Sequence, residues 1–184
     1  MNESEVNGSD VNESEVITEL LAALGPTGVI TDADVAMPYR FDRAATAEPG
    51  RPLAVVRPSS TAEVQATVRI AAAHRVPIVT RGAGTGLSGG STAVDGAITL
   101  STDRMRAVRV DPAAQLAVVQ PGALNVEVKA AAAREGLWYP PDPSSFEICS
   151  IGGNLATNAG GLCCVRYGVT TDYVLGLEVV LADG

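Results

Sequence analysis

The stretch that most constrains this chain is RGAGTGLSGG, residues 81–90, which holds five glycines in ten positions directly after the apolar run VPIVT. Glycine reaches positive φ at little cost, and it lets backbone N–H groups approach a phosphate that a Cβ would keep away. Each glycine also costs roughly 1 kcal/mol of conformational entropy relative to alanine. Because core packing gains nothing from these glycines, the stretch predicts a loop whose backbone binds phosphate, with a purely structural loop as the alternative.

The spacing of these glycines matches G-x-G-x-x-G at Gly84, Gly86 and Gly89. In a dinucleotide-binding Rossmann fold a helix begins inside this motif and its N-terminus holds the pyrophosphate. Here the sequence continues as GSTAVDGAITLS, which is poor helix material and reaches a strand within about six residues. No Gly-Lys-Ser/Thr closes the motif either. The context therefore disfavours a Rossmann fold and excludes a P-loop ATPase.

A second glycine-rich segment, SIGGNLATNAGG at residues 150–161, also combines glycines with small polar side chains. Two such loops in one apolar domain suggest one extended ligand held at two places, and a dinucleotide has the right length. Few Lys or Arg residues lie nearby, so backbone amides would balance most of the phosphate charge. For Arg81 two roles stay open, assistance to the diphosphate or a salt bridge at the protein surface.

The surrounding pattern predicts strands and helices in one chain. Ser60 and Glu63 form a capping box that opens a helix to about His74, and Asn125 is expected to cap a helix closed by Gly136. Helices are expected at 16–24, 60–74 and 125–134, and strands at 52–58, 76–81, 96–101, 106–111, 115–122 and 174–184.

The two ends of the chain differ from its body. Residues 1–15 contain the acidic sequence NESEV twice and predict a disordered tail, followed over 16–51 by a helix and a linker punctuated by Pro and Gly. The last predicted strand ends on Asp183 and Gly184, a hairpin turn signal without a partner strand. We therefore expect residues 52–184 to be one domain that is incomplete at its C-terminal end.

Charge and cysteine content exclude several classes of protein. The formal net charge is −8, but residues 1–39 carry eight acids and no Lys or Arg, so the body is neutral and no nucleic-acid partner is expected. No run approaches 18 apolar residues, which argues against a membrane span. Three cysteines without a Cys/His cluster predict neither a disulfide framework nor a metal site, and they suit a reducing cytosol.

Six motifs in order carry a family resemblance: RGAGTGLSGG, VQPGALN, PPDPSS, SIGGNLATNAGG, RYG and LGLEVVLADG. Together they resemble the FAD-binding domain of the vanillyl-alcohol oxidase/p-cresol methylhydroxylase (PCMH) superfamily. They are most similar to its D-2-hydroxy-acid dehydrogenase branch, which includes the glycolate oxidase FAD subunit. The resemblance runs from Pro52 to the last residue and implies an α+β fold of two α+β subdomains with FAD between them, the cap domain being absent.

The resemblance also assigns cofactor-binding residues. It places the pyrophosphate loop at Arg81, Gly82, Ala83, Gly84, Thr85, Gly86, Leu87 and Ser88. It places a flavin-side turn at Pro121 and Gly122, and the segment near the isoalloxazine at Pro141, Asp142 and Ser145. It places the second cofactor loop at Ser150, Gly152, Gly153, Thr157, Asn158, Gly160 and Gly161. It places the ribityl and adenine contacts at Tyr167, Gly168, Glu178, Val179 and Val180.

The implied activity is oxidation of a D-2-hydroxy acid, such as lactate, glycolate or 2-hydroxyglutarate, to the 2-oxo acid by hydride transfer to flavin N5. A quinone, a flavoprotein or another carrier would accept the electrons, so the protein is expected in the cytoplasm, at most peripheral to a membrane. No catalytic residue is named, because in this branch the substrate site and any metal-ligand histidines lie in the cap domain. Alternatives are a non-catalytic FAD-binding module or subunit that needs a partner, and an NADPH-dependent reductase of the same fold.

Non-covalent FAD is expected, because the candidate tethers are poorly placed. The only histidine, His74, lies on the predicted first long helix and is expected to face solvent. Cys149 is expected to be a small buried thiol. Cys163 and Cys164 are expected to pack in the core, since adjacent cysteines form only strained disulfides.

Overall fold

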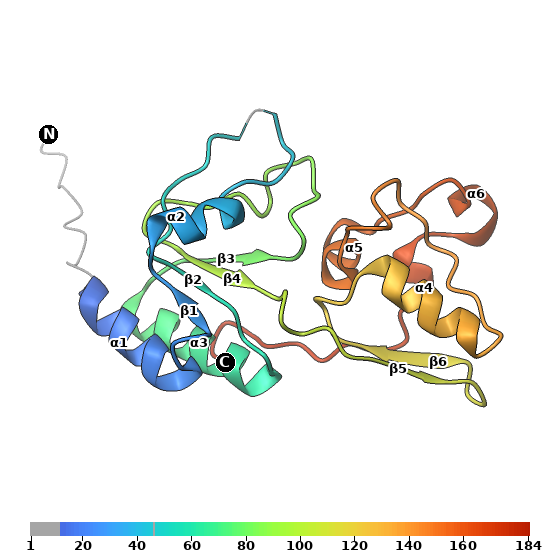
Figure 1. Ribbon diagram of the computed structural model, residues 1–184, viewed down its shortest axis with the longest axis horizontal. Helices are drawn as coiled ribbons and strands as arrows, with labels where there is room; N and C mark the ends of the chain where they lie inside the picture. Colours follow the sequence, from blue (N-terminus) through green and yellow to red (C-terminus); the bar gives the residue numbers. More distant parts are fainter. Residues whose placement is uncertain (1–11, 46) are drawn as a thin grey trace, which may run out of the picture.

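The computed structural model describes residues 12–45 and 47–184, and it places them in two lobes (Figure 1). One lobe holds a four-stranded sheet with helices α1 to α3, and the other holds a two-stranded sheet with helices α4 to α6. Each lobe combines helices with a sheet, which confirms the expected α+β fold of two subdomains.

The first lobe is built on a mostly parallel sheet in the order β1-β2-β4-β3. Strands β2 and β3 both run parallel to β4, and the short β1 pairs antiparallel with β2 at one edge. Helices α1 and α3 pack on this sheet, and their apolar side chains meet the strands in one buried core. The elements are α1 (Glu13–Leu24), β1 (Val29–Ile30), α2 (Ala33–Ala36), a 3₁₀ helix (Met37–Tyr39), β2 (Ala54–Val56), α3 (Thr61–His74), β3 (Ile78–Arg81) and β4 (Ile98–Ser101).

Strands β3 and β4 are adjacent and parallel, yet no helix connects them. The intervening residues 82–97 form the glycine-rich loop and a turn. A Rossmann unit would place a crossover helix here. The argument against that fold is therefore confirmed.

Helix α3 begins as the sequence predicts, while its far end differs. The Ser60 hydroxyl accepts the Glu63 N–H at 3.2 Å, and the Glu63 carboxylate accepts the Ser59 N–H at 2.7 Å. His74 was expected to face solvent, and this prediction is wrong: its side chain is 18% exposed and contacts Glu19 of α1 at 3.1 Å. Helix α1 also starts at Glu13, earlier than predicted, because Asn12 caps it. The rest of the acidic tail, residues 1–11, lies outside the described residues.

The second lobe packs α4 over a β-hairpin and against α5. Ala123, Val128 and Ile151 are its buried centre. Its elements are β5 (Val108–Asp111), β6 (Leu116–Val119), α4 (Asn125–Arg134), α5 (Ile151–Thr157), α6 (Cys164–Tyr167) and a 3₁₀ helix (Thr170–Tyr173).

The predicted cap of α4 is wrong. Leu124 occupies the N-cap position, and the Glu127 carboxylate accepts its N–H at 2.8 Å. Asn125 is fully buried in the first turn instead, where its side-chain amide donates to the Pro141 carbonyl at 3.2 Å. Gly136 follows the helix at φ +71°, as predicted for its C-terminal end.

The predicted strand at 174–184 is also wrong. These residues form no strand and run from the second lobe back to α3, where Gln65 and Arg69 donate to the Gly184 carbonyl at 3.0 and 2.9 Å. Leu175 and Leu177 are 81% and 63% exposed. The apolar run that suggested a strand has no neighbouring strand to pair with among the described residues. Over 12–45 and 47–184, no helix has both the length and the apolar character needed to cross a membrane.

Candidate phosphate-binding site

The glycine-rich loop leaves β3 and is held from the linker before β2. The Arg43 N–H donates to the Gly86 carbonyl at 2.9 Å, and the Ala93 N–H donates to the Arg40 carbonyl at 2.9 Å. Gly84 and Gly89 adopt φ of +67° and +77°, which a residue with a side chain rarely does. These contacts hold the loop through the Gly86 carbonyl and through Ala93, which follows the glycine-rich stretch.

The N–H groups in the middle of the loop remain available. Within the part of the chain that the structure describes, the backbone N–H groups from Gly84 to Ser88 donate no hydrogen bond. Their residues are exposed or half-buried, so a ligand can reach them. A run of unpaired N–H groups in a turning backbone is a typical anion-binding concavity. The loop therefore fits a phosphate or diphosphate group.

Arg81 lies behind this loop. It is 7% exposed, and its guanidinium donates to the carbonyl groups of Pro38 at 3.1 Å and Ser91 at 3.3 Å. A Cβ on Gly84 would collide with the same guanidinium, so the two groups are packed together. A surface salt bridge, one of the two roles left open, is therefore wrong. Burial lowers the pKa of Arg81, while the nearby Asp42 carboxylate opposes that shift.

Ser150 joins the two glycine-rich segments. Its hydroxyl oxygen accepts the Ala83 N–H at 3.1 Å and the Gly153 N–H at 3.4 Å. Gly82 permits this approach, because a Cβ there would collide with the Ser150 hydroxyl. The sequence places these segments about 65 residues apart, and the structure brings them into direct contact.

The second segment is a helix over most of its length, which corrects its interpretation as an open loop. In α5 the first N–H groups already have acceptors: Ile151 donates to Ala123 and Gly152 donates to Pro121, each at 2.8 Å. Gly122, next to the acceptor Pro121, also has no room for a side chain, because a Cβ there would collide with the Thr102 carbonyl. The N–H groups of Ile151 and Gly152 are consequently less available to a phosphate than those of the first loop.

The end of α5 is fixed by its polar side chains. Asn158 adopts φ +47°, and its side-chain oxygen accepts the N–H and the hydroxyl of Thr171 at 2.9 and 2.6 Å. The Thr157 hydroxyl donates back to the Gly153 carbonyl at 3.0 Å. The Asn158 side-chain N–H₂ remains as the group that could reach a ligand.

The Pro-rich segment packs against the glycines that follow α5. A Cβ on Gly161 would collide with Asp142, whose carboxylate also accepts the Cys163 N–H at 3.2 Å. A hydrogen bond to that carboxylate raises the pKa of the Cys163 thiol. The Lys129 ammonium of α4 donates to the Tyr139 carbonyl at 2.8 Å and so holds the start of the segment. Burial lowers the pKa of Lys129. Asp142 thus meets Gly161, as one shared site would require.

The cysteines and aromatic residues nearby differ in burial. Cys149 is 3% exposed, whereas Cys163 and Cys164 are half-buried rather than packed in the core as expected, and all three are free. Trp138 packs edge-to-face on Tyr167 with 4.7 Å between ring centroids.

Five predicted site residues lie apart from the first loop (Figure 1). Tyr167 and Gly168 are at α6, at the far end of the second lobe. Glu178 accepts the Thr61 hydroxyl at 3.2 Å, which places it and the adjacent Val179 and Val180 beside α3. Their assignment to the ribityl and adenine contacts stays a prediction.

The sequence pattern did not reveal Asp42, in the linker before β2. One of its carboxylate oxygens accepts the Ala44 N–H at 2.8 Å, and the other is buried beside Gly86 without a partner among the described residues. No motif identifies it, because the linker is recognisable only by its Pro and Gly residues. Its place beside the loop follows from the Arg43 and Arg40 backbone bonds.

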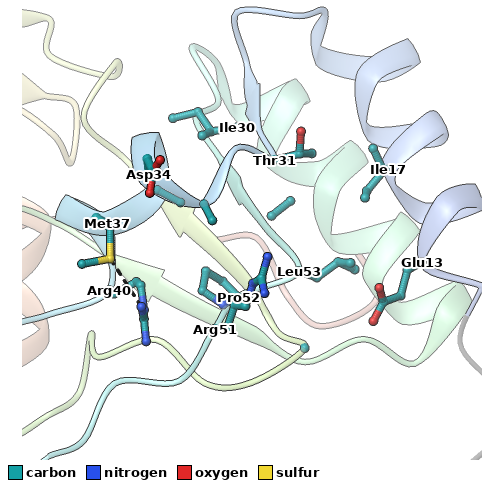
Figure 2. Close-up of a pocket in the computed structure, with 14 residues that line it drawn as sticks. Glu13, Ile17, Ile30, Thr31, Asp34, Met37, Arg40, Arg51, Pro52 and Leu53 are labelled. Carbon is teal, nitrogen blue, oxygen red and sulfur yellow. Dashed lines mark hydrogen bonds between the residues drawn. The ribbon is translucent and has the colours of Figure 1, made fainter.

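A pocket of about 680 Å³ lies elsewhere in the first lobe (Figure 2). It is lined from α1, α2 and the chain around β1 and β2, and it mixes Glu13, Asp34 and Arg51 with apolar Ile17 and Leu53. None of the predicted site residues lines it. The candidate site is therefore the exposed loop and its junction with α5, not this pocket.

Comparisons with known proteins bear on the same region. The family model described as an FAD binding domain matches residues 52–184. The glycolate oxidase subunit GlcD of Bacillus subtilis (strain 168) is 41% identical over 171 residues, which are 92% of this chain and 36% of that protein. The D-2-hydroxyglutarate dehydrogenase of Stutzerimonas stutzeri (strain A1501) is 38% identical over 95% of this chain and 38% of its own length.

Other relatives agree in fold and extent. The D-lactate dehydrogenase of Archaeoglobus fulgidus is 41% identical over 79% of this chain and 33% of its own length. Among solved structures, alkyldihydroxyacetonephosphate synthase matches with a TM-score of 0.79 at 26% identity, over 86% of this chain and 32% of that chain. p-Cresol methylhydroxylase matches in fold with a TM-score of 0.71 at 22% identity, over 83% of this chain and 31% of that chain. The chain spans about a third of the length of the curated relatives it matches.

Proposed function

The chain belongs to the family of FAD binding domains, and on that premise we propose that it is the FAD-binding part of an oxidoreductase that oxidises a D-2-hydroxy acid to the 2-oxo acid. The observation that carries this proposal is the row of unpaired N–H groups from Gly84 to Ser88. These groups would bind the diphosphate of FAD, and Gly82, Gly84 and Ser150 would keep the loop in the required conformation.

FAD, when bound, supplies the redox chemistry by accepting a hydride at its flavin ring. The residues of this chain contribute binding and orientation. The loop would fix the diphosphate, and the contact between Ala83 and Ser150 would set the position of the second lobe relative to it. Pro141, Asp142 and Gly161 would form the side of the site that the flavin approaches.

The substrate class rests on the relatives. Their names specify glycolate, D-lactate and D-2-hydroxyglutarate, which share a hydroxyl group next to a carboxylate. A carrier such as a quinone or a flavoprotein would accept the electrons. We propose non-covalent FAD, because His74 is engaged with Glu19 and Cys149 is 3% exposed. The free cysteines support the expected reducing compartment, the cytoplasm.

Two measurements on the full chain test this function. Titration with FAD, followed by quenching of flavin fluorescence, is expected to show saturable binding that is much tighter than binding of riboflavin, which lacks the diphosphate. Reduction of a dye is then expected with D-lactate, glycolate or D-2-hydroxyglutarate, and not with L-lactate. Binding without turnover would support the alternative of a non-catalytic module or of a subunit that needs a partner. Absence of FAD binding by the folded chain would contradict both.

A further inference from the structure

We propose that Arg81 strengthens diphosphate binding without contacting it, by holding a buried positive charge against the inner side of the glycine-rich loop. This inference rests on the proposed function and adds a positioning residue to it. A diphosphate carries negative charge that the N–H groups of a loop balance only in part. A charge directly behind those groups adds to their potential.

The geometry separates Arg81 from the exposed side of the loop. Its guanidinium donates to Pro38 and Ser91, one on either side of the loop in sequence, and packs on Gly84. At 7% exposure it has little access to solvent, so ligand binding on the outer side of the loop leaves these bonds intact. Arg81 therefore acts through the loop backbone and not as a direct ligand.

Among the described residues, Arg81 forms no direct ion pair. In the described part of the chain, no carboxylate oxygen lies within 4.0 Å of the Arg81 nitrogens. Asp103 is paired with Arg57 at 3.0 Å and also accepts the Tyr39 hydroxyl. The Asp42 carboxylate is also near Arg81, and one of its oxygens accepts the Ala44 N–H. Backbone carbonyls, which carry no net charge, are the hydrogen-bond partners of the guanidinium.

Burial makes this charge effective at a distance. A buried charge is screened little by salt, and it acts through a lower dielectric than an exposed one. The continuous run of unpaired N–H groups begins at Gly84, the residue that touches the guanidinium. The positive charge of Arg81 consequently lies at Gly84, where the diphosphate would begin to bind, whereas the Asp42 carboxylate lies beside Gly86, further along the loop.

Three substitutions separate charge from hydrogen bonding. Arg81→Lys keeps the charge and a donor, Arg81→Gln keeps a donor without charge, and Arg81→Met keeps neither. Arg109→Met removes an exposed charge from β5 and is the control. We expect R81K to bind FAD within about threefold of the parent, and R81Q and R81M to bind it at least about tenfold more weakly. Riboflavin affinity should stay unchanged in all four variants.

The outcomes distinguish this inference from the proposed function. Failure of the parent chain to bind FAD would contradict the function itself. Parent-like FAD binding by folded R81Q would overturn the inference alone. So would equal losses in R81K and R81Q, because these indicate a purely structural role. If R81Q and R81M do not fold, the Arg81 Nε–H resonance of the parent provides the test: FAD is expected to shift it, riboflavin is not, and equal shifts would overturn the inference.

Discussion

At the scale of single residues, the glycines of the first loop have separate functions. Gly84 needs a left-handed conformation and space for Arg81, whereas Gly90 has no positive φ and nothing within 4 Å of the place a Cβ would take. The sequence could predict that the stretch turns and exposes its backbone. It could not predict which glycine is indispensable, since that depends on an arginine that folds back under the loop.

Substitution of Gly84 tests this difference. Gly84→Ala places a side chain in a left-handed conformation, which costs about 1–2 kcal/mol, and drives it into the buried guanidinium. We expect FAD to bind at least about tenfold more weakly, measured by flavin fluorescence. Gly90→Ala, six residues further along the same loop at an exposed position, should stay within about twofold. Equal effects of the two substitutions would mean that the loop conformation described for Gly84 is unimportant.

At the scale of elements, the sequence predicted those with strong local signals. The helix opened by Ser60 and the strands flanking the glycine-rich loop occur where expected. The predictions fail where a contact between residues far apart in the sequence determines the local structure. Asn125 is a good local cap, but burial against Pro141 moves the cap to Leu124. Residues 151–157 contain two glycines and still form a helix, because Ser150 caps it and Pro121 and Ala123 accept its first N–H groups.

The two serine caps provide a matched comparison. Ser150→Ala leaves the N–H groups of Ala83 and Gly153 without their acceptor, and we expect a loss of about 1–2 kcal/mol in unfolding free energy. FAD affinity should also fall roughly tenfold, because the loop loses its bond to α5. Ser60→Ala removes a cap from α3 that does not touch the loop, so it should lose about 1 kcal/mol and leave FAD affinity unchanged. Urea unfolding and flavin titration measure the two effects. Loss of affinity in both variants would show that general instability, not the contact between segments, explains the result.

The cap of α4 predicts a pH dependence. The backbone bond from Leu124, and then the Arg106 side chain, lower the pKa of Glu127 below its ordinary value. A carboxylate whose pKa is lowered on folding stabilises the protein above its unfolded pKa of about 4.3, and this contribution disappears as the pH falls through the folded pKa.

We therefore expect Glu127→Gln to lower the unfolding free energy by about 0.5–1 kcal/mol at pH 7, a modest effect because the side chain is 39% exposed. The difference from the parent should shrink as the pH drops below about 4. Urea unfolding at both pH values measures it. A difference that stays constant between pH 7 and pH 3 would exclude a role for the ionised carboxylate.

At the scale of the whole molecule, the resemblance of six motifs predicted an FAD-binding domain of two α+β subdomains, and the family match and the two lobes of the structure agree. The sequence could not show that α1 and β1, which precede the matched residues, complete the first lobe: Val16 and Leu20 are fully buried in its core. It also could not place residues 174–184, because a strand pattern needs a neighbouring strand to form a sheet.

The central claim is that the backbone N–H groups from Gly84 to Ser88 bind the diphosphate of FAD. Hydrogen–deuterium exchange of the folded full chain, followed over peptides that cover residues 82–90, measures these groups directly. We expect saturating FAD to slow exchange in this loop, and riboflavin at matched occupancy to leave it unchanged. Exchange in the loop that stays as fast with FAD bound as without it would contradict the claim.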